Sequence, residues 1–267
     1  MPDDRDRPCR TGPIAGSPGA PLMAVLSGAR EHTAGPPAPA DPQPRDGAPL
    51  LYDSRRGVHY TKPLLRGWLH LLWFEASLVA GTLLGVAADG VRQTVAVVIY
   101  AGCLSGLFGV SALYHRGNWG PAASRLLQRA DHTMITLLIA GTATPVLLLG
   151  VPGPYGLGGV VVLWCLTAVA TGTRLAYMNA PEWLVGGSFI GLGAVNVLAL
   201  PAMWAHVGAA AALLVIAGGL LYIIGALAYH RRSPDPYPSV FGYHEVFHAF
   251  VCVAATCHYV AIALLVG

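Results

Sequence analysis

The sequence predicts an all-α membrane protein, a bundle of seven transmembrane helices. Hydrophobic residues make up 54% of the 267 residues and charged residues only 11%, whereas soluble domains carry about 25% charged residues. So few charges cannot cover a surface that faces water. After Leu64, apolar runs of about twenty residues follow one another, and that length suffices to cross a hydrocarbon core of roughly 30 Å. The loops between these runs also predict an orientation in the membrane, because basic residues gather in the loops on one side of it.

Residues 1–62 form a separate region with a different composition. Pro, Gly, Ala, Asp and Arg dominate it, and no helical periodicity is present. Such a segment cannot bury enough apolar surface to offset the entropy lost on ordering, so we predict a disordered N-terminal tail. The membrane domain is expected to comprise residues 63–267.

Seven apolar spans are predicted in the membrane domain. Their boundaries are 67–88, 93–114, 132–151, 157–178, 184–204, 208–229 and 245–266. The breaks between them consist of turn-forming or polar residues: Ala88-Asp89-Gly90, the loop from Arg116 to Arg129, Pro152-Gly153-Pro154, Asn179-Ala180-Pro181-Glu182, His206, and Arg231 to Pro238. The break at His206 is the weakest, since no other polar residue separates the fifth span from the sixth.

The basic residues lie almost entirely on one side of the predicted membrane. With the N-terminus in the cytoplasm, Arg92 is the only basic residue of the outer loops, and ten lie on the inner flanks: Arg55, Arg56, Lys62, Arg66, Arg116, Arg125, Arg129, Arg174, Arg231 and Arg232. Because inner loops are enriched in Lys and Arg, we predict a cytoplasmic N-terminus and a C-terminus outside. The excess of Arg over Lys suggests a GC-rich bacterial genome, so we expect a multi-pass protein of the plasma (inner) membrane.

Five polar residues sit at span ends that this topology places on the cytoplasmic side: Ser111, His115, Asp131, His244 and His248. Ionisable groups within spans are rare and usually functional. A helix places His244 and His248 on one face, where two imidazoles can bind one metal ion. With His115, they would leave the fourth position of a tetrahedral zinc ion open, as in catalytic sites. Asp131 is then placed to orient a water molecule or take its proton, and Ser111, one turn deeper than His115, to hydrogen-bond the water or a substrate carbonyl.

Each of these residues also has a structural interpretation. The two histidines of the last span can form a pH-sensitive interfacial feature or a chance pair. Ser111 can serve helix packing, and Asp131 can be the N-cap of the third helix. The convergence of three span ends at one depth favours the metal site.

Other polar residues in the spans give weaker indications. Glu75 is the only carboxylate well inside a span, and we expect it to face the bundle. His70 lies in the same span. His132 is rotated by about 100° from Asp131 on a helix, so it is expected to face lipid headgroups or another helix. The net charge of +3 gives no indication of nucleic acid, which we do not expect as a partner.

Three motifs together carry a resemblance to a known family. They are Ser111-x-x-x-His115, Asp131-His132 followed by the run Ala140-Gly-Thr-Ala-Thr-Pro145, and His244-x-x-x-His248. In these motifs the chain resembles the hemolysin III family, the bacterial branch of the progestin and adiponectin Q receptor superfamily, over about residues 62–267. The resemblance implies a seven-helix bundle with a cytoplasmic N-terminus and a Zn²⁺ ion on the three histidines. It also implies that Asp131 meets the zinc through water, with Ser111 close by.

The first helix departs from the family pattern. Many members carry a Glu and an Asn ahead of a Thr-His pair, whereas this chain reads Pro63-Leu-Leu-Arg-Gly-Trp-Leu-His70. His70 matches, and the Glu and Asn are missing. Any role of those two residues therefore has no counterpart here, while the zinc set is intact.

The resemblance leaves several functions open. Relatives are viewed as ceramidase-like lipid amide hydrolases, as receptors, as factors in membrane-lipid homeostasis or as pore-forming hemolysins. An open zinc position beside an aspartate favours a zinc-dependent hydrolase of an acyl lipid. A zinc ion that only joins the second helix to the seventh, in a sensor or structural protein, is the main alternative. Membrane lipids are the expected partners, and the oligomeric state is left open.

Overall fold

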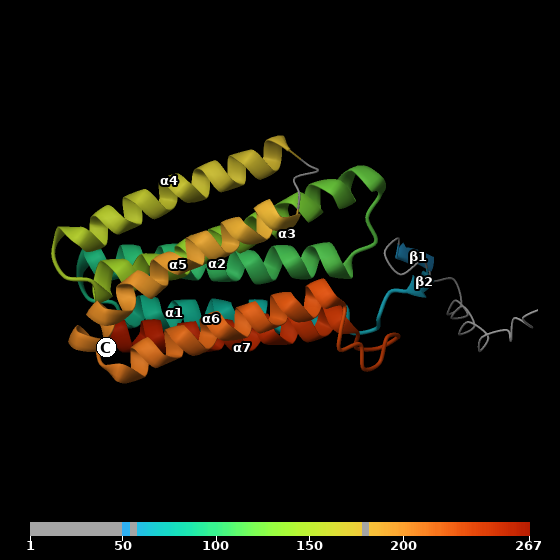
Figure 1. Ribbon diagram of the computed structural model, residues 1–267. Helices are drawn as coiled ribbons and strands as arrows, with labels where there is room; N and C mark the ends of the chain where they lie inside the picture. Colours follow the sequence, from blue (N-terminus) through green and yellow to red (C-terminus); the bar gives the residue numbers. More distant parts are fainter. Residues whose placement is uncertain (1–49, 54–57, 178–181) are drawn as a thin grey trace, which may run out of the picture. The chain divides into compact units, whose positions relative to one another are not determined.

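The computed structural model describes residues 50–53, 58–177 and 182–267 (Figure 1). Its described residues include seven helices that are long and apolar enough to cross a membrane. They are α1 (Trp68–Ala87), α2 (Gly90–Arg116), α3 (Pro121–Gly150), α4 (Pro154–Ala176), α5 (Glu182–His206), α6 (Ala209–Arg231) and α7 (Tyr243–Val266). The predicted seven-helix membrane fold is confirmed, whereas the orientation of its ends stays a prediction.

Proline and glycine account for several helix ends. Pro121 and Pro154 occupy the first turns of α3 and α4, where the N–H group that proline lacks would have no helical partner. Gly153 (φ +70°) and Gly208 (φ +119°) precede α4 and α6 with backbone angles that other residues rarely adopt. Such residues end one span and start the next, which is why the spans could be counted from the sequence.

Helix α3 starts earlier than predicted. The loop expected from Arg116 to Arg129 is largely helical, and only residues 117–120 connect α2 to α3. Residues 121–130 are too polar to be recognised as part of a span, but they include Ala, Leu, Gln and Arg, which favour helix. Asp131 therefore lies about three turns inside α3. The interpretation of Asp131 as the N-cap is wrong, because that position belongs to Gly120.

Helix α3 is the central helix of the bundle. It packs against α2, α4, α5 and α7, and residues 140–148 are buried throughout. Gly141 allows α2 to approach closely, since a Cβ atom there would lie 2.6 Å from Cβ of Cys103. Gly218 of α6 has the same role against α7, where a Cβ atom would lie 2.4 Å from the ring of His258. Small residues thus set the distance between neighbouring helices, as is common in membrane bundles.

Two short strands precede the helices, and the sequence analysis did not predict them. Strand β1 (Leu50–Asp53) pairs with the antiparallel strand β2 (Val58–Thr61). They belong to the end of the tail that was expected to be disordered. The other parts of that tail, residues 1–49 and 54–57, lie outside the described residues.

The segment between β2 and α1 runs along the loop that precedes α7. The N–H groups of Leu64 and Leu65 donate to the carbonyls of Ser239 (3.1 Å) and Val240 (3.0 Å). These bonds tie the start of α1 to the start of α7. Both starts lie at the end of the bundle that holds the candidate site.

Candidate metal centre

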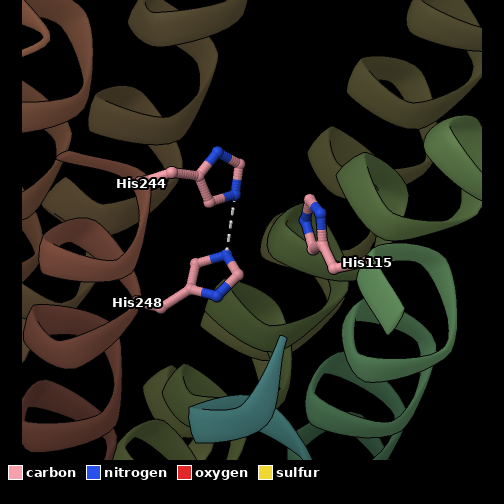
Figure 2. A group of neighbouring side chains, drawn as sticks. All are labelled: His115, His244 and His248. Carbon is pink, nitrogen blue, oxygen red and sulfur yellow. Dashed lines mark hydrogen bonds between the residues drawn. The ribbon is translucent and has the colours of Figure 1, made fainter. Parts of the chain in front are cut away.

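Three histidines from α2 and α7 converge at one end of the bundle (Figure 2). His115 lies in the last turn of α2, while His244 and His248 lie one turn apart at the start of α7 and point toward it. Each offers one ring nitrogen, and these three nitrogens lie within 4.8 Å of one another. His115 and His248 are buried, and His244 is partly buried. The structure thus brings together the three predicted metal ligands in a group that can hold a metal ion.

The two imidazoles of α7 face each other directly. Their Nε2 atoms are 3.0 Å apart. The ring of His115 meets both at steep angles, with 4.6 Å between its centroid and that of His244 and 5.1 Å to that of His248. Tyr229 of α6 also packs edge-on against His244, with 5.2 Å between centroids. The orientation of these rings is therefore set by packing as well as by the spacing of four residues along α7.

Asp131 places a carboxylate beside this group. Its side chain comes from α3, the residue is 9% exposed, and its Oδ2 atom lies 3.7 Å from Nε2 of His115. This distance is too long for a hydrogen bond. The carboxylate can therefore accept a hydrogen bond from a small molecule between the helices.

Ser111 and a fourth histidine complete the inner side of the site. Ser111 lies one turn before His115 on α2, and its Oγ atom is 2.8 Å from Nδ1 of His70 on α1. The ring of His70 stacks on that of His248. Sequence reasoning gave His70 no role, although its match to the histidine of the family's first-helix motif was a usable signal.

A buried ion pair fixes the start of α7. Nε of Arg66, just before α1, contacts Oε1 of Glu245, which is 1% exposed. The other carboxylate oxygen of Glu245 accepts the N–H of Gly242 at 2.8 Å, as in a capping box. Lys62 lies in the same segment as Arg66. Burial lowers the pKa of its ammonium group most, and the positive charges of Arg66 and Arg116 lower it further. The spacing of three residues between Gly242 and Glu245 could have indicated the cap from the sequence. Nothing in the sequence indicated that Arg66 is the partner of Glu245.

The comparison with protein families covers the residues of this site. The family model described as "Haemolysin-III related" matches residues 58–259. The chain belongs to this family. The match includes all of α1 to α6 and most of α7, with every residue placed at the site above.

Relatives of the haemolysin-III-related protein occur in bacteria and plants. "Hemolysin-3 homolog" of Bacillus subtilis is 28% identical over 126 residues, which cover 47% of this chain and 56% of the relative. "Hemolysin-3" of Bacillus cereus is 27% identical over 157 residues, 59% of this chain and 68% of the relative. "Heptahelical transmembrane protein ADIPOR2" of rice (Oryza sativa subsp. japonica) is 36% identical over 120 residues, 42% of this chain and half of the relative. These names agree with the progestin and adiponectin Q receptor superfamily. The first relative is matched over little more than half of its length.

Two other polar residues of the predicted spans, Glu75 and His132, are not part of the histidine group. Glu75 is exposed on α1, so the expectation that it faces the bundle is wrong. His132 is partly buried, and its Nδ1 atom accepts a hydrogen bond from Nη2 of Arg174 on α4 at 2.8 Å. His132 was expected to face either lipid headgroups or another helix, and in the structure it contacts another helix, α4.

Proposed function

We propose that this protein is a zinc-dependent hydrolase that cleaves the acyl bond of a membrane lipid and acts in membrane-lipid homeostasis. The observation that carries the proposal is the convergence of three histidine nitrogens within 4.8 Å, with a buried carboxylate 3.7 Å from one of them. Structural zinc sites fill four positions with protein ligands, whereas catalytic sites keep one open. Three histidines beside an aspartate follow the second pattern.

The spacing of the two histidines on α7 fits zinc. Two nitrogens bound to one tetrahedral zinc ion at about 2.0–2.1 Å would lie about 3.3 Å apart. The Nε2 atoms of His244 and His248 are 3.0 Å apart, close to that separation. A set of imidazoles also favours zinc over magnesium or calcium, which prefer oxygen ligands.

The residues around this position can carry out acyl hydrolysis. A bound zinc ion would polarise the acyl carbonyl of the substrate and make water a better nucleophile near neutral pH. Asp131 would hold that water and accept its proton. The water oxygen joins the acyl carbon, the bond from this carbon to nitrogen or oxygen breaks, and the proton passes from Asp131 to the leaving amine or alcohol. Ser111 lies one turn before His115 on α2, and its hydroxyl would hydrogen-bond the water or the substrate carbonyl.

A zinc-linked sensor or structural membrane protein is the second candidate. One observation favours it: α2 and α7 pack little against each other. Each of them packs instead against α1 and α3. A metal ion shared by His115 and the histidines of α7 would link two helices that the bundle otherwise holds together mainly through others. Both candidates need the metal, and they differ in whether a substrate is turned over.

Zinc-dependent release of fatty acid tests the hydrolase. Purified protein in detergent would be given a ceramide, a simple fatty amide and a phospholipid, once after zinc loading and once after chelation. We expect slow release from the zinc-loaded protein alone, because the chelated protein lacks the group that activates the carbonyl. Release that is absent with all three lipids would leave the structural candidate in place.

We further infer that the metal centre faces the cytoplasm. The basic residues flanking this end of the bundle support the orientation. A reporter that is active only in the cytoplasm is expected to work when inserted between α2 and α3, in residues 117–120, and to fail after Gly267. Because the described helices number seven, activity after Gly267 would place the metal centre outside and refute this orientation.

A further inference from the structure

Residues 62–68, between β2 and the first turn of α1, form a strap that contacts both helices that carry the proposed metal ligands. At one end of the strap, Nζ of Lys62 donates a hydrogen bond to the carbonyl of Gly117 at 3.4 Å. At the other end, the guanidinium of Arg116 lies over a ring of Trp68, with 3.7 Å between Cζ and the ring centroid. The strap is thus fixed to the last residue of α2 and to the residue that follows it.

Gly67 places the backbone of the strap directly against His115. Its φ angle is +78°, a conformation that residues with a side chain rarely adopt. A Cβ atom at this position would lie 3.0 Å from Cβ of His115. His115 is the penultimate residue of α2 and lies close to the end of the bundle, yet it is only 9% exposed. The strap therefore helps to bury the proposed metal ligand of α2.

The strap is bound to α7 by two backbone hydrogen bonds and an ion pair. The N–H groups of Leu64 and Leu65 donate to carbonyls of the loop before α7. Arg66 pairs with Glu245, the residue that directly follows His244. One carboxylate oxygen of Glu245 contacts Arg66, and the other accepts the N–H of the helix cap. Because Glu245 is buried, the loss of Arg66 would leave its charge without a counter-ion. The position of the first turn of α7 thus depends on the strap.

The strap acts where the two ligand-bearing helices make few contacts of their own. Helices α2 and α7 pack little against each other. The strap touches the last turn of α2 and the first turn of α7 at once, and these are the turns that carry His115 and His244. A tetrahedral metal site needs its nitrogens at fixed distances from the ion. Residues outside the ligand set commonly fix the ligands in place.

We propose that Arg66 is a positioning residue of the metal centre, which holds His115 at binding distance from the two histidines of α7. The inference rests on the metal centre of the proposed function and states how its two halves are held together. The ion pair keeps the first turn of α7 against the strap, and Gly67 keeps the strap against His115. Without the pair, α2 and α7 keep their places in the bundle, but their histidines no longer stay close enough to share one ion.

Four variants separate positioning from stability. Arg66→Gln removes the charge that binds Glu245. The double variant Arg66→Gln with Glu245→Gln leaves no unpaired charge in the bundle, and the new amide can still accept the N–H of Gly242. Arg66→Lys keeps a cation in the strap. Arg129→Gln is the matched control, because Arg129 is an exposed arginine in the first turns of α3, at the same end of the bundle.

The measurements include two that need no zinc. Zinc affinity is obtained by competition with a coloured chelator, and Co²⁺ is bound in place of zinc because its visible spectrum reports the number and arrangement of the ligands. In the chelated protein, the unfolding temperature is measured. The rate at which diethyl pyrocarbonate modifies His115 is followed there by mass spectrometry, since this rate depends on access to the imidazole.

We expect Arg66→Gln and the double variant to bind zinc about 10–100-fold more weakly than the wild-type protein, the usual effect of losing a residue that orients metal ligands. Their Co²⁺ spectra should change, and His115 should react faster with diethyl pyrocarbonate. Arg66→Lys should recover part of the affinity, and Arg129→Gln should match the wild-type protein. An ion pair with a purely structural role would lower the unfolding temperature and leave the Co²⁺ spectrum of the folded protein unchanged.

Wild-type zinc affinity and wild-type reactivity of His115 in the double variant would overturn the inference, as would an equal loss of affinity in Arg129→Gln. The double variant decides if Arg66→Gln fails to fold, because it contains no buried charge without a partner. A wild-type protein that binds no zinc would reject the metal centre of the proposed function. The reactivity of His115 in the chelated proteins would then still show whether Arg66 holds the strap against it.

Discussion

Replacing Asp131 with Asn is expected to lower lipid hydrolysis about 10²–10⁴-fold, the usual contribution of a general base, while the fold and the metal are retained. The carboxamide has the size of the carboxylate and can still hydrogen-bond a water molecule, but it cannot accept a proton. Asp131 is nearly buried in α3 and is not one of the three histidine ligands, so the exchange leaves the metal-binding nitrogens in place. The measurements are kcat and KM for fatty-acid release, together with zinc content by mass spectrometry.

Asp89→Asn serves as the control for this exchange. Asp89 is an exposed carboxylate at the start of α2, at the helix end opposite to His115, and its replacement is expected to leave hydrolysis unchanged. Equal release of fatty acid by the wild-type protein and Asp131→Asn would contradict the hydrolase and leave the sensor or structural role. In that case Asp131→Asn would resemble the wild-type protein in every assay, and only the histidine variants would lower thermal stability.

The purified protein is expected to hold about one zinc ion per chain, and His244→Ala or His248→Ala should lose most of it, because a site of this kind needs its three imidazoles. Each substitution removes one of the two nitrogens that lie 3.0 Å apart. Asp131→Ala should keep more zinc than either variant, since its carboxylate lies beside a ligand and is not one itself. Metal content would be measured after dialysis against a weak chelator.

His206→Ala is the matched control for the loss of zinc. His206 is an exposed histidine at the end of α5, and it is not part of the histidine group. Its replacement should leave the zinc content unchanged. Equal zinc in the wild-type protein and in the double variant of His244 and His248 would rule out the metal centre.

The spans and the histidines were predictable because the signals for both are local. An apolar run long enough to cross the bilayer identifies a span whatever its neighbours are. A spacing of four residues places His244 and His248 on one face of a helix in any fold. The start of α3 was misplaced for the same reason, since residues 121–130 are helical but too polar to be counted as part of a span.

Roles that depend on which helices meet could not be predicted. Glu245 is buried because Arg66, far away in the sequence, reaches it. The cost of a charge in lipid suggested that Glu75 faces the bundle. The buried face of α1 is instead formed by residues that include His70 and Ser77. Glu75 lies about 160° around the helix from Ser77, on the exposed side.

The division of the three histidines between α2 and α7 has a consequence for biosynthesis. His115 enters the membrane with the second helix, and four more helices, α3 to α6, must follow before His244 and His248 are made. A metal ion that needs all three nitrogens can be captured only after α7 has inserted. The first six helices must therefore insert without help from the metal, and metal uptake would mark a chain whose insertion is complete. A nascent chain arrested before Tyr243 would carry His115 as its only member of the histidine group, with no means of retaining the ion.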